Sequence, residues 1–216
     1  MIRLALFASG GGSNMDAILK AIDAGRLDAT PVLVVSDRET AGALDRARKR
    51  DLPVAVVPPG DDAAEFGRAL LDVLAGAEAD TVALAGYLRK IPEPVLWAYP
   101  NRVFNVHPSL LPSFGGPGLY GRRVHQAVLD YGCRISGATI HLVEADYDTG
   151  PVVLQESVRV LPDDTPETLA ARVLAVEHRL YPEALSLLAS GRLSVEGRRI
   201  TITGSDAPNP SIPSPP

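Results

Sequence analysis

Two polar residues near the middle of the chain, Asn105 and His107, have side chains that could carry out proton-transfer chemistry together. They stand in the stretch Asn105–Pro112, which reads Asn-Val-His-Pro-Ser-Leu-Leu-Pro. An imidazole can move a proton near neutral pH, and an amide can donate a hydrogen bond to an oxygen that becomes negative during a reaction. The alternative is a strand end with a capping asparagine and a structural histidine. On this pair alone the two interpretations are evenly balanced.

A predicted strand positions this pair. The run Arg102-Val-Phe-Asn-Val is apolar enough to be buried, and Pro108 cannot continue a ladder, so the strand should end at His107. Side chains alternate along a strand, so Asn105 and His107 point to the same face. If the strand is parallel to its neighbours, the pair lies at the carboxyl edge of the sheet, where open α/β sheets bind ligands.

A glycine-rich loop follows the first predicted strand, Ile2–Ala8. It reads Ser-Gly-Gly-Gly-Ser-Asn and leads into a predicted helix, Met15–Ala24. Glycines let a backbone approach a ligand closely, and the free N–H groups at the start of a helix favour an anion. The loop matches neither the dinucleotide fingerprint nor the P-loop pattern. The alternative is a tight turn with a Ser or Asn cap.

Strands and helices are predicted to alternate through the first half of the chain, which indicates an α/β fold with a doubly wound parallel sheet. The further strands expected there are Pro31–Ser36, Val54–Val57 and Thr81–Ala85. The helices expected between them are Ala41–Arg50 and a helix that opens at Asp61. Trp97 is expected to pack under the loop Gly86–Ile91.

The second half is predicted to contain an antiparallel or crossed pair of strands, Ile135–Val143 and Val152–Val160, joined by an acidic turn. A helix from about residue 163 to 188 should be kinked or split by Pro182. Gly197–Thr203 is expected to form a last strand. We expect a single domain over residues 1–203 and a disordered tail over residues 204–216, which are rich in proline and serine.

Composition narrows the functional class. The chain has 216 residues, a net charge of -5 and a single cysteine, Cys133. The excess of acidic over basic residues argues against a broad surface that binds nucleic acid. A single cysteine cannot form an internal disulfide. The apolar start at Ile2 is too short for a membrane span and lacks signal-peptide features. These features predict a cytoplasmic protein without a nucleic-acid or membrane partner.

Four motifs in order give the chain a resemblance to a known family. They are Ser-Gly-Gly-Gly-Ser-Asn, Leu84-Ala-Gly-Tyr-Leu-Arg-Lys-Ile, Asn105-Val-His-Pro-Ser-Leu-Leu-Pro and Asp148-Thr-Gly-Pro. From Ile2 to Arg192 the sequence resembles the phosphoribosylglycinamide formyltransferases, folate-dependent enzymes of purine biosynthesis. The resemblance implies a Rossmann-like formyltransferase fold, with a mostly parallel central sheet and helices on both faces. It also implies transfer of the formyl group of 10-formyltetrahydrofolate to the amine of glycinamide ribonucleotide.

The resemblance assigns a catalytic trio to Asn105, His107 and Asp148. The amide and a protonated imidazole would stabilise the oxyanion of a tetrahedral intermediate. The carboxylate would raise the pKa of His107 or order a water that carries protons. Composition alone would make Asp148 a turn residue and could not choose it over Asp146.

The resemblance also assigns binding residues. For glycinamide ribonucleotide these are Gly12, Ser13, Asn14, Gly118 and Glu177. For the folate they are Arg89, Lys90, Ile91, Val143 and Asp148. His141 is a second-tier candidate, because a lone histidine on a strand is more often structural. No metal is expected.

Two departures from the family pattern affect this assignment. The loop Phe114–Arg123 is longer than or rearranged from the one in many members, so its substrate contacts do not follow from the resemblance. Leu174 stands where many relatives carry a polar residue, so the contacts to the phosphate or the ribose are expected to differ from those of the family.

Other functions remain open from the sequence. A methionyl-tRNA formyltransferase would need a C-terminal tRNA-binding domain and more basic character, and a formyltetrahydrofolate hydrolase would carry an N-terminal regulatory domain. A nucleotide- or folate-binding module without chemistry is the non-enzyme alternative. A homodimer is compatible with the sequence, which does not decide how many chains assemble.

Overall fold

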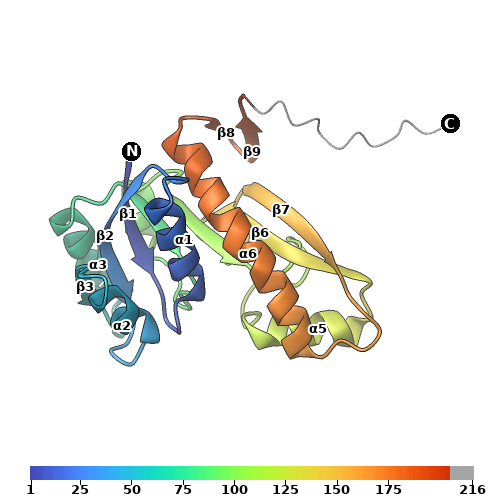
Figure 1. Ribbon diagram of the computed structural model, residues 1–216. Helices are drawn as coiled ribbons and strands as arrows, with labels where there is room; N and C mark the ends of the chain where they lie inside the picture. Colours follow the sequence, from blue (N-terminus) through green and yellow to red (C-terminus); the bar gives the residue numbers. More distant parts are fainter. Residues whose placement is uncertain (205–216) are drawn as a thin grey trace.

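A seven-stranded sheet forms the centre of the protein (Figure 1), with the strand order β3-β2-β1-β4-β5-β6-β7. The computed structural model describes residues 1–204, so the predicted tail lies, from residue 205 onward, outside the described residues. The strands of this sheet are β1 (Ile2–Phe7), β2 (Ala29–Ser36), β3 (Val54–Val56), β4 (Thr81–Leu84), β5 (Val103–His107), β6 (Ile135–Leu142) and β7 (Val152–Arg159).

The sheet is mostly parallel, as predicted. Strands β1 to β5 all pair in parallel, while β6 runs antiparallel to β5 and β7 runs antiparallel to β6. The strand order places β5 in the interior of the sheet, where Asn105 lies beside Leu84 on one side and His141 on the other. The predicted hairpin-like pair is therefore confirmed as an antiparallel extension of a parallel sheet.

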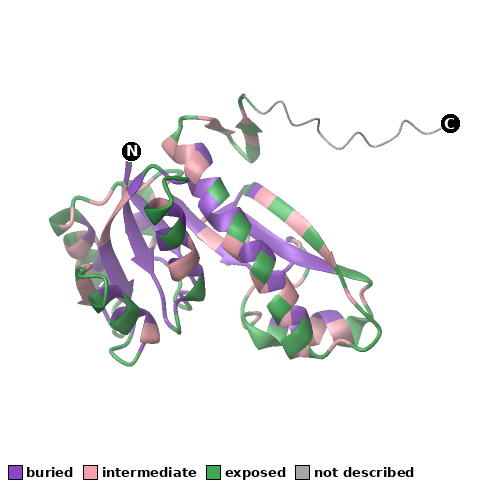
Figure 2. Ribbon diagram, in the orientation of Figure 1, coloured by how far each residue is buried: buried purple, intermediate pink, exposed green. Residues whose placement is uncertain are grey.

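Helices cover both faces of the sheet, as expected for strands that are apolar throughout. They are α1 (Ser13–Asp23), α2 (Gly42–Arg48), α3 (Ala63–Gly76), α4 (Glu93–Ala98), α5 (Arg122–Tyr131) and α6 (Pro166–Ala189). One core cluster joins the sheet to α1, α2 and α6 through residues such as Met15, Leu44 and Leu180. A second cluster joins the opposite face to α3 and α4 through Phe66, Leu70 and Val95. Figure 2 shows the buried strands between these two layers.

Helix α6 is continuous across Pro182, so the predicted split is wrong. Its start is well defined, because Thr165 caps it and Pro166 stands in the first turn, where a proline removes no helical hydrogen bond. Pro182 itself is buried within the helix. Packing of this long helix against the sheet therefore outweighs the local preference of proline to end it.

The predicted last strand is confirmed as β9 (Arg199–Ile202), and it pairs antiparallel with a strand that was not predicted, β8 (Leu193–Glu196). Gly197, at a φ of 57°, allows the tight turn between them. One further expectation differs from the structure. Trp97 does not pack under a loop, because the segment after Pro92 forms α4 and the indole is 73% exposed on its outer side.

Candidate active site

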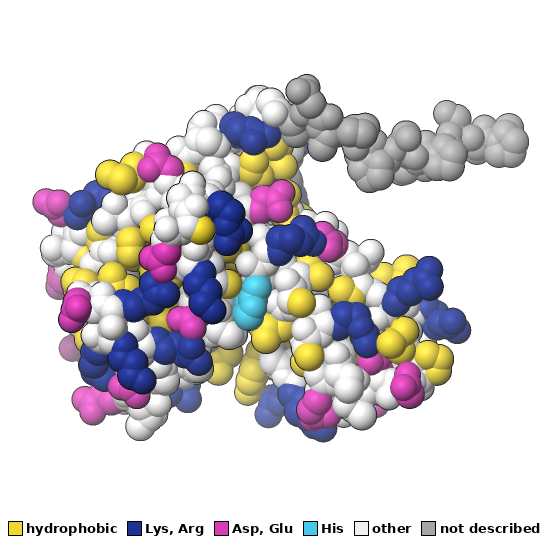
Figure 3. Space-filling model, viewed as in Figure 1, with side chains coloured by type: hydrophobic (Ala, Val, Ile, Leu, Met, Phe, Trp, Pro, Cys, Tyr) yellow, Lys and Arg dark blue, Asp and Glu magenta, His cyan; other side chains and the backbone are white. Residues whose placement is uncertain are grey.

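A cavity of about 540 Å³ opens at the carboxyl ends of β4 and β5. Its walls come from the start of α1, the segment after β4, the loop before α5, the turn between β6 and β7, and the first half of α6. Figure 3 shows a notch between the part of the molecule that carries α5 and the part that carries α1 and α2. Of the residues predicted for the site, Asn14, Asn105, His107, Gly118, Asp148 and Glu177 line this cavity.

His107 ends β5 and is only 4% exposed. Its Nε2 atom lies 2.8 Å from the carbonyl oxygen of Phe114, which can only accept, so Nε2 carries a proton. Its Nδ1 atom lies 3.4 Å from Oδ2 of Asp148. The carboxylate is thus within direct reach of the imidazole, as the proposed proton transfer requires.

Asp148, and not Asp146, is the carboxylate that meets the imidazole. Asp148 stands in the turn between β6 and β7 with a left-handed φ of 56°, and its Oδ2 accepts the N–H of Gly116 at 2.8 Å. Asp146 is 85% exposed and has only Lys90 within ion-pair distance, at 3.9 Å. Phe114 also has a left-handed φ of 56°. Two non-glycine residues in this unfavourable conformation therefore lie against the same histidine.

Burial and neighbouring charges have opposite effects on the pKa values of His107 and Asp148. Burial is the largest influence on His107 and lowers the pKa of its imidazole, although the Asp148 carboxylate and the Phe114 carbonyl act to raise it. The imidazole is therefore neutral at neutral pH, and the expectation of a protonated ring does not describe the free protein. Burial would raise the pKa of Asp148, but hydrogen bonding to His141, the charge of His107 and the Gly116 N–H together lower it. Asp148 is therefore ionised.

His141 orients the amide of Asn105. The Nδ1 atom of His141 donates to the carbonyl oxygen of Leu142 at 2.8 Å, which turns the Nε2 edge of the ring toward Asn105 and Asp148. This Nε2 atom lies 3.0 Å from Nδ2 of Asn105 and 3.6 Å from Oδ1 of Asp148. The second-tier histidine is thus in direct contact with two members of the predicted trio.

The start of α1 contributes a second polar group to the cavity. Gly12 has a φ of 78° and lies against α2, where an added Cβ would approach the Cβ of Ala43 to 2.9 Å. The next two residues differ in exposure, because Ser13 is exposed and Asn14 is buried. Asn14 donates from Nδ2 to Oε2 of Glu177 at 2.7 Å. Burial raises the pKa of Glu177, and the Asn14 hydrogen bond opposes this shift. Asn14 Oδ1 is buried and has no hydrogen-bond partner among residues 1–204.

Among the predicted folate residues, Asp148 lines the cavity, whereas the other four, Arg89, Lys90, Ile91 and Val143, lie outside its wall. Arg89 donates from Nε to Oδ2 of Asp37 at 2.8 Å and remains 47% exposed. Ile91 is 3% exposed and packs in the second core cluster, so only its backbone could contact a ligand. The N–H of Val143 donates to the carbonyl oxygen of Val103 at 2.9 Å. Lys90 is half-exposed.

One cavity residue was missed by the sequence analysis. His125, in the first turns of α5, lines the cavity and is 4% exposed, and its Nδ1 atom is buried without a hydrogen-bond partner. Burial and the proximity of His107 lower the pKa of its imidazole. The available signal was a histidine one turn after a glycine-rich loop beside the site.

Two features of residues 1–204 concern membranes and metals. Within this range no helix is both long enough and apolar enough to span a membrane. In the same part of the chain, His, Cys, Asp and Glu side chains do not gather in groups of three or more that could hold a metal ion.

Comparison with known proteins places the site in a family context. Residues 2–185 match the family model described as formyl transferase. The chain is 45% identical, over 88% of its length, to the chloroplastic phosphoribosylglycinamide formyltransferase of Arabidopsis thaliana, and spans 66% of that relative. It is 35% identical to phosphoribosylglycinamide formyltransferase from Bacillus subtilis, covering 87% of this chain and 95% of the relative.

Solved structures show the same similarity. Glycinamide ribonucleotide transformylase 1 from Symbiobacterium toebii superposes with a TM-score of 0.88 at 43% identity, and 94% of each chain is covered. A formyltetrahydrofolate deformylase from Pseudomonas syringae superposes with a TM-score of 0.85 at 25% identity, and the match covers 93% of this chain but 65% of the deformylase.

Proposed function

Because the chain belongs to the formyl transferase family, we propose that it transfers the formyl group of 10-formyltetrahydrofolate to the amine of glycinamide ribonucleotide, a step in purine biosynthesis. The observation that carries this proposal is the contact between Asp148 and His107 beside Asn105, inside the one cavity that also receives Asn14 and Glu177. The names of the most similar relatives and solved structures support the choice of substrate.

The proposed reaction proceeds through a tetrahedral intermediate. The amine attacks the formyl carbon, the carbonyl oxygen becomes negative, and the bond to the folate nitrogen then breaks. The amide of Asn105 and the Nε2–H of His107 donate to the oxyanion. In the free protein the Phe114 carbonyl accepts from that N–H at 2.8 Å, so the substrate oxygen replaces this carbonyl.

Proton transfer is the second part of the mechanism. The amine must lose a proton and the folate nitrogen must gain one. A neutral His107 can accept a proton, and the ionised Asp148 beside Nδ1 stabilises the imidazolium that results. A water held by Asp148 would serve the same transfer over a longer path.

The nucleotide is proposed to lie along the side of the cavity formed by α1 and α6. The carboxylate of Glu177 can accept hydrogen bonds from ribose hydroxyls, and Asn14 holds it in place. The N–H groups at the start of α1, following Gly12 and Ser13, favour the phosphate because α1 has no side-chain cap there. Gly118, in the opposite wall, contacts the glycinamide end.

The folate is proposed to enter beside the segment after β4. Arg89 and Lys90 are half-exposed and can bind its acidic groups, while the backbones of Ile91, Val143 and Asp148 form hydrogen bonds with the pterin. A reducing cytoplasm suits a chain with a single cysteine.

A formyl-transfer assay tests the function directly. Purified protein is given 10-formyltetrahydrofolate together with glycinamide ribonucleotide, with water alone, or with charged methionyl-tRNA. We expect formylated glycinamide ribonucleotide only in the first reaction. Release of formate at an equal rate without an amine acceptor would instead assign the hydrolytic activity named for the Pseudomonas syringae relative.

Replacing His107 tests the mechanism. The variant His107→Ala should lose roughly 10²–10⁴-fold in turnover, the usual contribution of a positioned acid–base group. Binding of 10-formyltetrahydrofolate, measured by calorimetry, should persist because the contact assigned to this side chain forms with the oxyanion of the intermediate and not with the pterin or the acidic groups. A variant that is folded by circular dichroism and has unchanged turnover would remove His107 from the chemistry.

A further inference from the structure

A second, smaller hollow lies on the outer surface between α1, α2 and α6. It has a volume of about 290 Å³, and the side chains at its edge include Lys20, Arg26, Arg46 and His178. Figure 3 shows a histidine between dark blue basic side chains on this surface. His178 is half-buried, whereas the other three histidines of the chain are buried. We call this hollow the basic groove.

The positive charge of the basic groove is only partly neutralised. Arg46 pairs with Asp16, which also lines the groove. Lys20 and Arg26 have no carboxylate within 4.0 Å in the described chain, whereas most neighbouring arginines do. This local excess of cations stands against a net charge of -5 for the whole chain.

His178 adds an unsatisfied polar group. Its Nε2 atom is shielded from solvent and makes no hydrogen bond within residues 1–204. Burial and the charge of Lys20 lower the pKa of this imidazole, although Asp16 acts to raise it. The neutral ring therefore lies at the edge of the groove without adding a charge to it.

The basic groove and the reaction cavity are separate but share a wall. Asn14 and Glu177 line the cavity, and a chain neighbour of each lines the groove: Ser13, which precedes Asn14, and His178, which follows Glu177. The buried Asn14–Glu177 hydrogen bond therefore lies between the two spaces. An anion in the groove would contact the outer side of the same two helices that form the nucleotide side of the cavity.

The charges on the two sides of this wall differ. The cavity is lined by three carboxylates, Asp148, Glu167 and Glu177, and the one guanidinium in its wall, that of Arg122, is paired with Glu167. The groove has three cations and one carboxylate. Of the two spaces, the groove is the one whose charge suits a free multivalent anion.

We propose that the basic groove is a second binding site that takes the phosphate or pyrophosphate group of a phosphorylated small molecule. Two guanidinium groups and an ammonium group can each form charge-assisted hydrogen bonds with phosphate oxygens, and the Ser13 hydroxyl can donate another. The small volume suits a compact headgroup better than a whole nucleotide. The site does not depend on the proposed formyl transfer.

Calorimetric titration with inorganic pyrophosphate at low ionic strength tests the site. We expect one molecule bound per chain, with affinity that falls as salt is added. The double variant Lys20→Ala/Arg26→Ala should weaken binding by about tenfold or more, because two charge-assisted contacts are removed. Both side chains are exposed, so the variant should fold normally.

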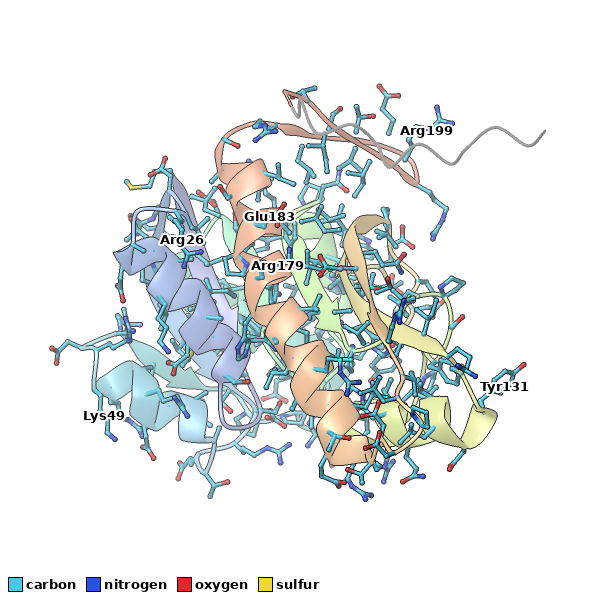
Figure 4. The ribbon with its side chains drawn as sticks, turned by 45° about the vertical axis from the view of Figure 1, so that its right-hand side comes forward. Arg26, Lys49, Tyr131, Arg179, Glu183 and Arg199 are labelled. Atoms are coloured by element: carbon cyan, nitrogen blue, oxygen red, sulfur yellow. The ribbon has the colours of Figure 1, made fainter. Side chains whose placement is uncertain are left out.

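The matched control is Arg179→Ala. Arg179 follows His178 on α6, but it is paired with Glu156 and Glu183 and is not among the residues that line the groove. Figure 4 shows Arg179 and Glu183 on α6 and Arg26 beyond the end of α1. This control removes one positive charge from the same surface and should leave pyrophosphate affinity within about twofold of that of the unaltered protein.

Competition identifies the source of the phosphate. If glycinamide ribonucleotide displaces pyrophosphate, the groove is the phosphate subsite of the substrate and not a second site, which overturns the proposal. If both bind together, the groove serves a different phosphorylated molecule. The proposal is overturned if pyrophosphate does not bind, or if the double variant and the Arg179→Ala control bind it as tightly as the unaltered protein.

Discussion

At the scale of single residues, the site depends on a carboxylate held in a backbone conformation that few side chains adopt. Asp148 tolerates its left-handed φ of 56° because its short polar side chain can form local hydrogen bonds. It accepts the N–H of Gly116 and lies within 3.6 Å of two imidazoles. Asparagine tolerates the same backbone, so the charge can be removed without moving the turn.

The variant Asp148→Asn tests the electrostatic role of this carboxylate. The carboxylate acts to raise the pKa of His107 against the lowering caused by burial. Removing it should lower that pKa further. If neutral His107 is the active form, the acidic limb of kcat/KM against pH should move to lower pH, while the rate on the plateau falls.

Asp146→Asn is the matched control for this measurement. Asp146 stands two residues earlier in the same turn and is 85% exposed, away from the imidazole. The same limb should not move in this control. If the acidic limb moves to higher pH in Asp148→Asn, the carboxylate does not raise the pKa of His107, which would contradict the assignment.

At the scale of elements, the turn between β6 and β7 is held close to the sheet by a glycine. A Cβ added to Gly150 would lie 1.9 Å from the carbonyl oxygen of Leu142, the last residue of β6. The hairpin β8–β9 supports the same turn, because Arg198 donates to the carbonyl oxygen of Thr149 at 2.7 Å. The position of Asp148 therefore depends on contacts from both sides of its turn.

The variant Gly150→Ala should move this turn and destabilise the protein. The clash is with backbone that cannot rotate away, so we expect a loss of roughly 2 kcal/mol, or about 4–8 °C in Tm. Turnover should fall as Asp148 leaves His107. Gly76→Ala is the control, since its added Cβ meets nothing within 4 Å and alanine favours the helix. Equal melting temperatures for the two variants would show that the turn is not tightly packed.

At the scale of the whole molecule, α6 connects the sheet strands on which the site depends. Tyr181 is fully buried, and its hydroxyl donates to the carbonyl oxygens of Phe104 at 2.9 Å and Leu84 at 3.2 Å. One turn earlier on the same helix, Glu177 holds Asn14 at the start of α1. A single helix therefore fixes α1, β4 and β5 relative to one another.

The variant Tyr181→Phe tests this connection. It leaves two buried carbonyl oxygens without their donor, which should reduce the free energy of unfolding by about 1–3 kcal/mol in urea titration. Tyr131→Phe is the control, because Tyr131 is 81% exposed and its hydroxyl has no such partners in the described chain. A loss no larger than the control's would mean that α6 is held by apolar packing alone.

The sequence by itself determined the elements and the face on which Asn105 and His107 lie. Periodicity along a strand or helix is a local property, so β1 to β7 were predicted with only small errors at their ends. Errors arose where packing outweighed local preference, as at Pro182 inside α6 and at Trp97 on the outside of α4.

Only the tertiary structure decided which distant residues meet. Asp146 and Asp148 are both aspartates of the same turn, so residue type does not distinguish them. The path of the turn between β6 and β7 brings only Asp148 to His107. The local sequence around His125 and around the cations of the basic groove does not show what these residues contact, because their surroundings come from elements that are far apart in the chain. Strand order and helix packing set these distances, and neither follows from the spacing of residues along the chain.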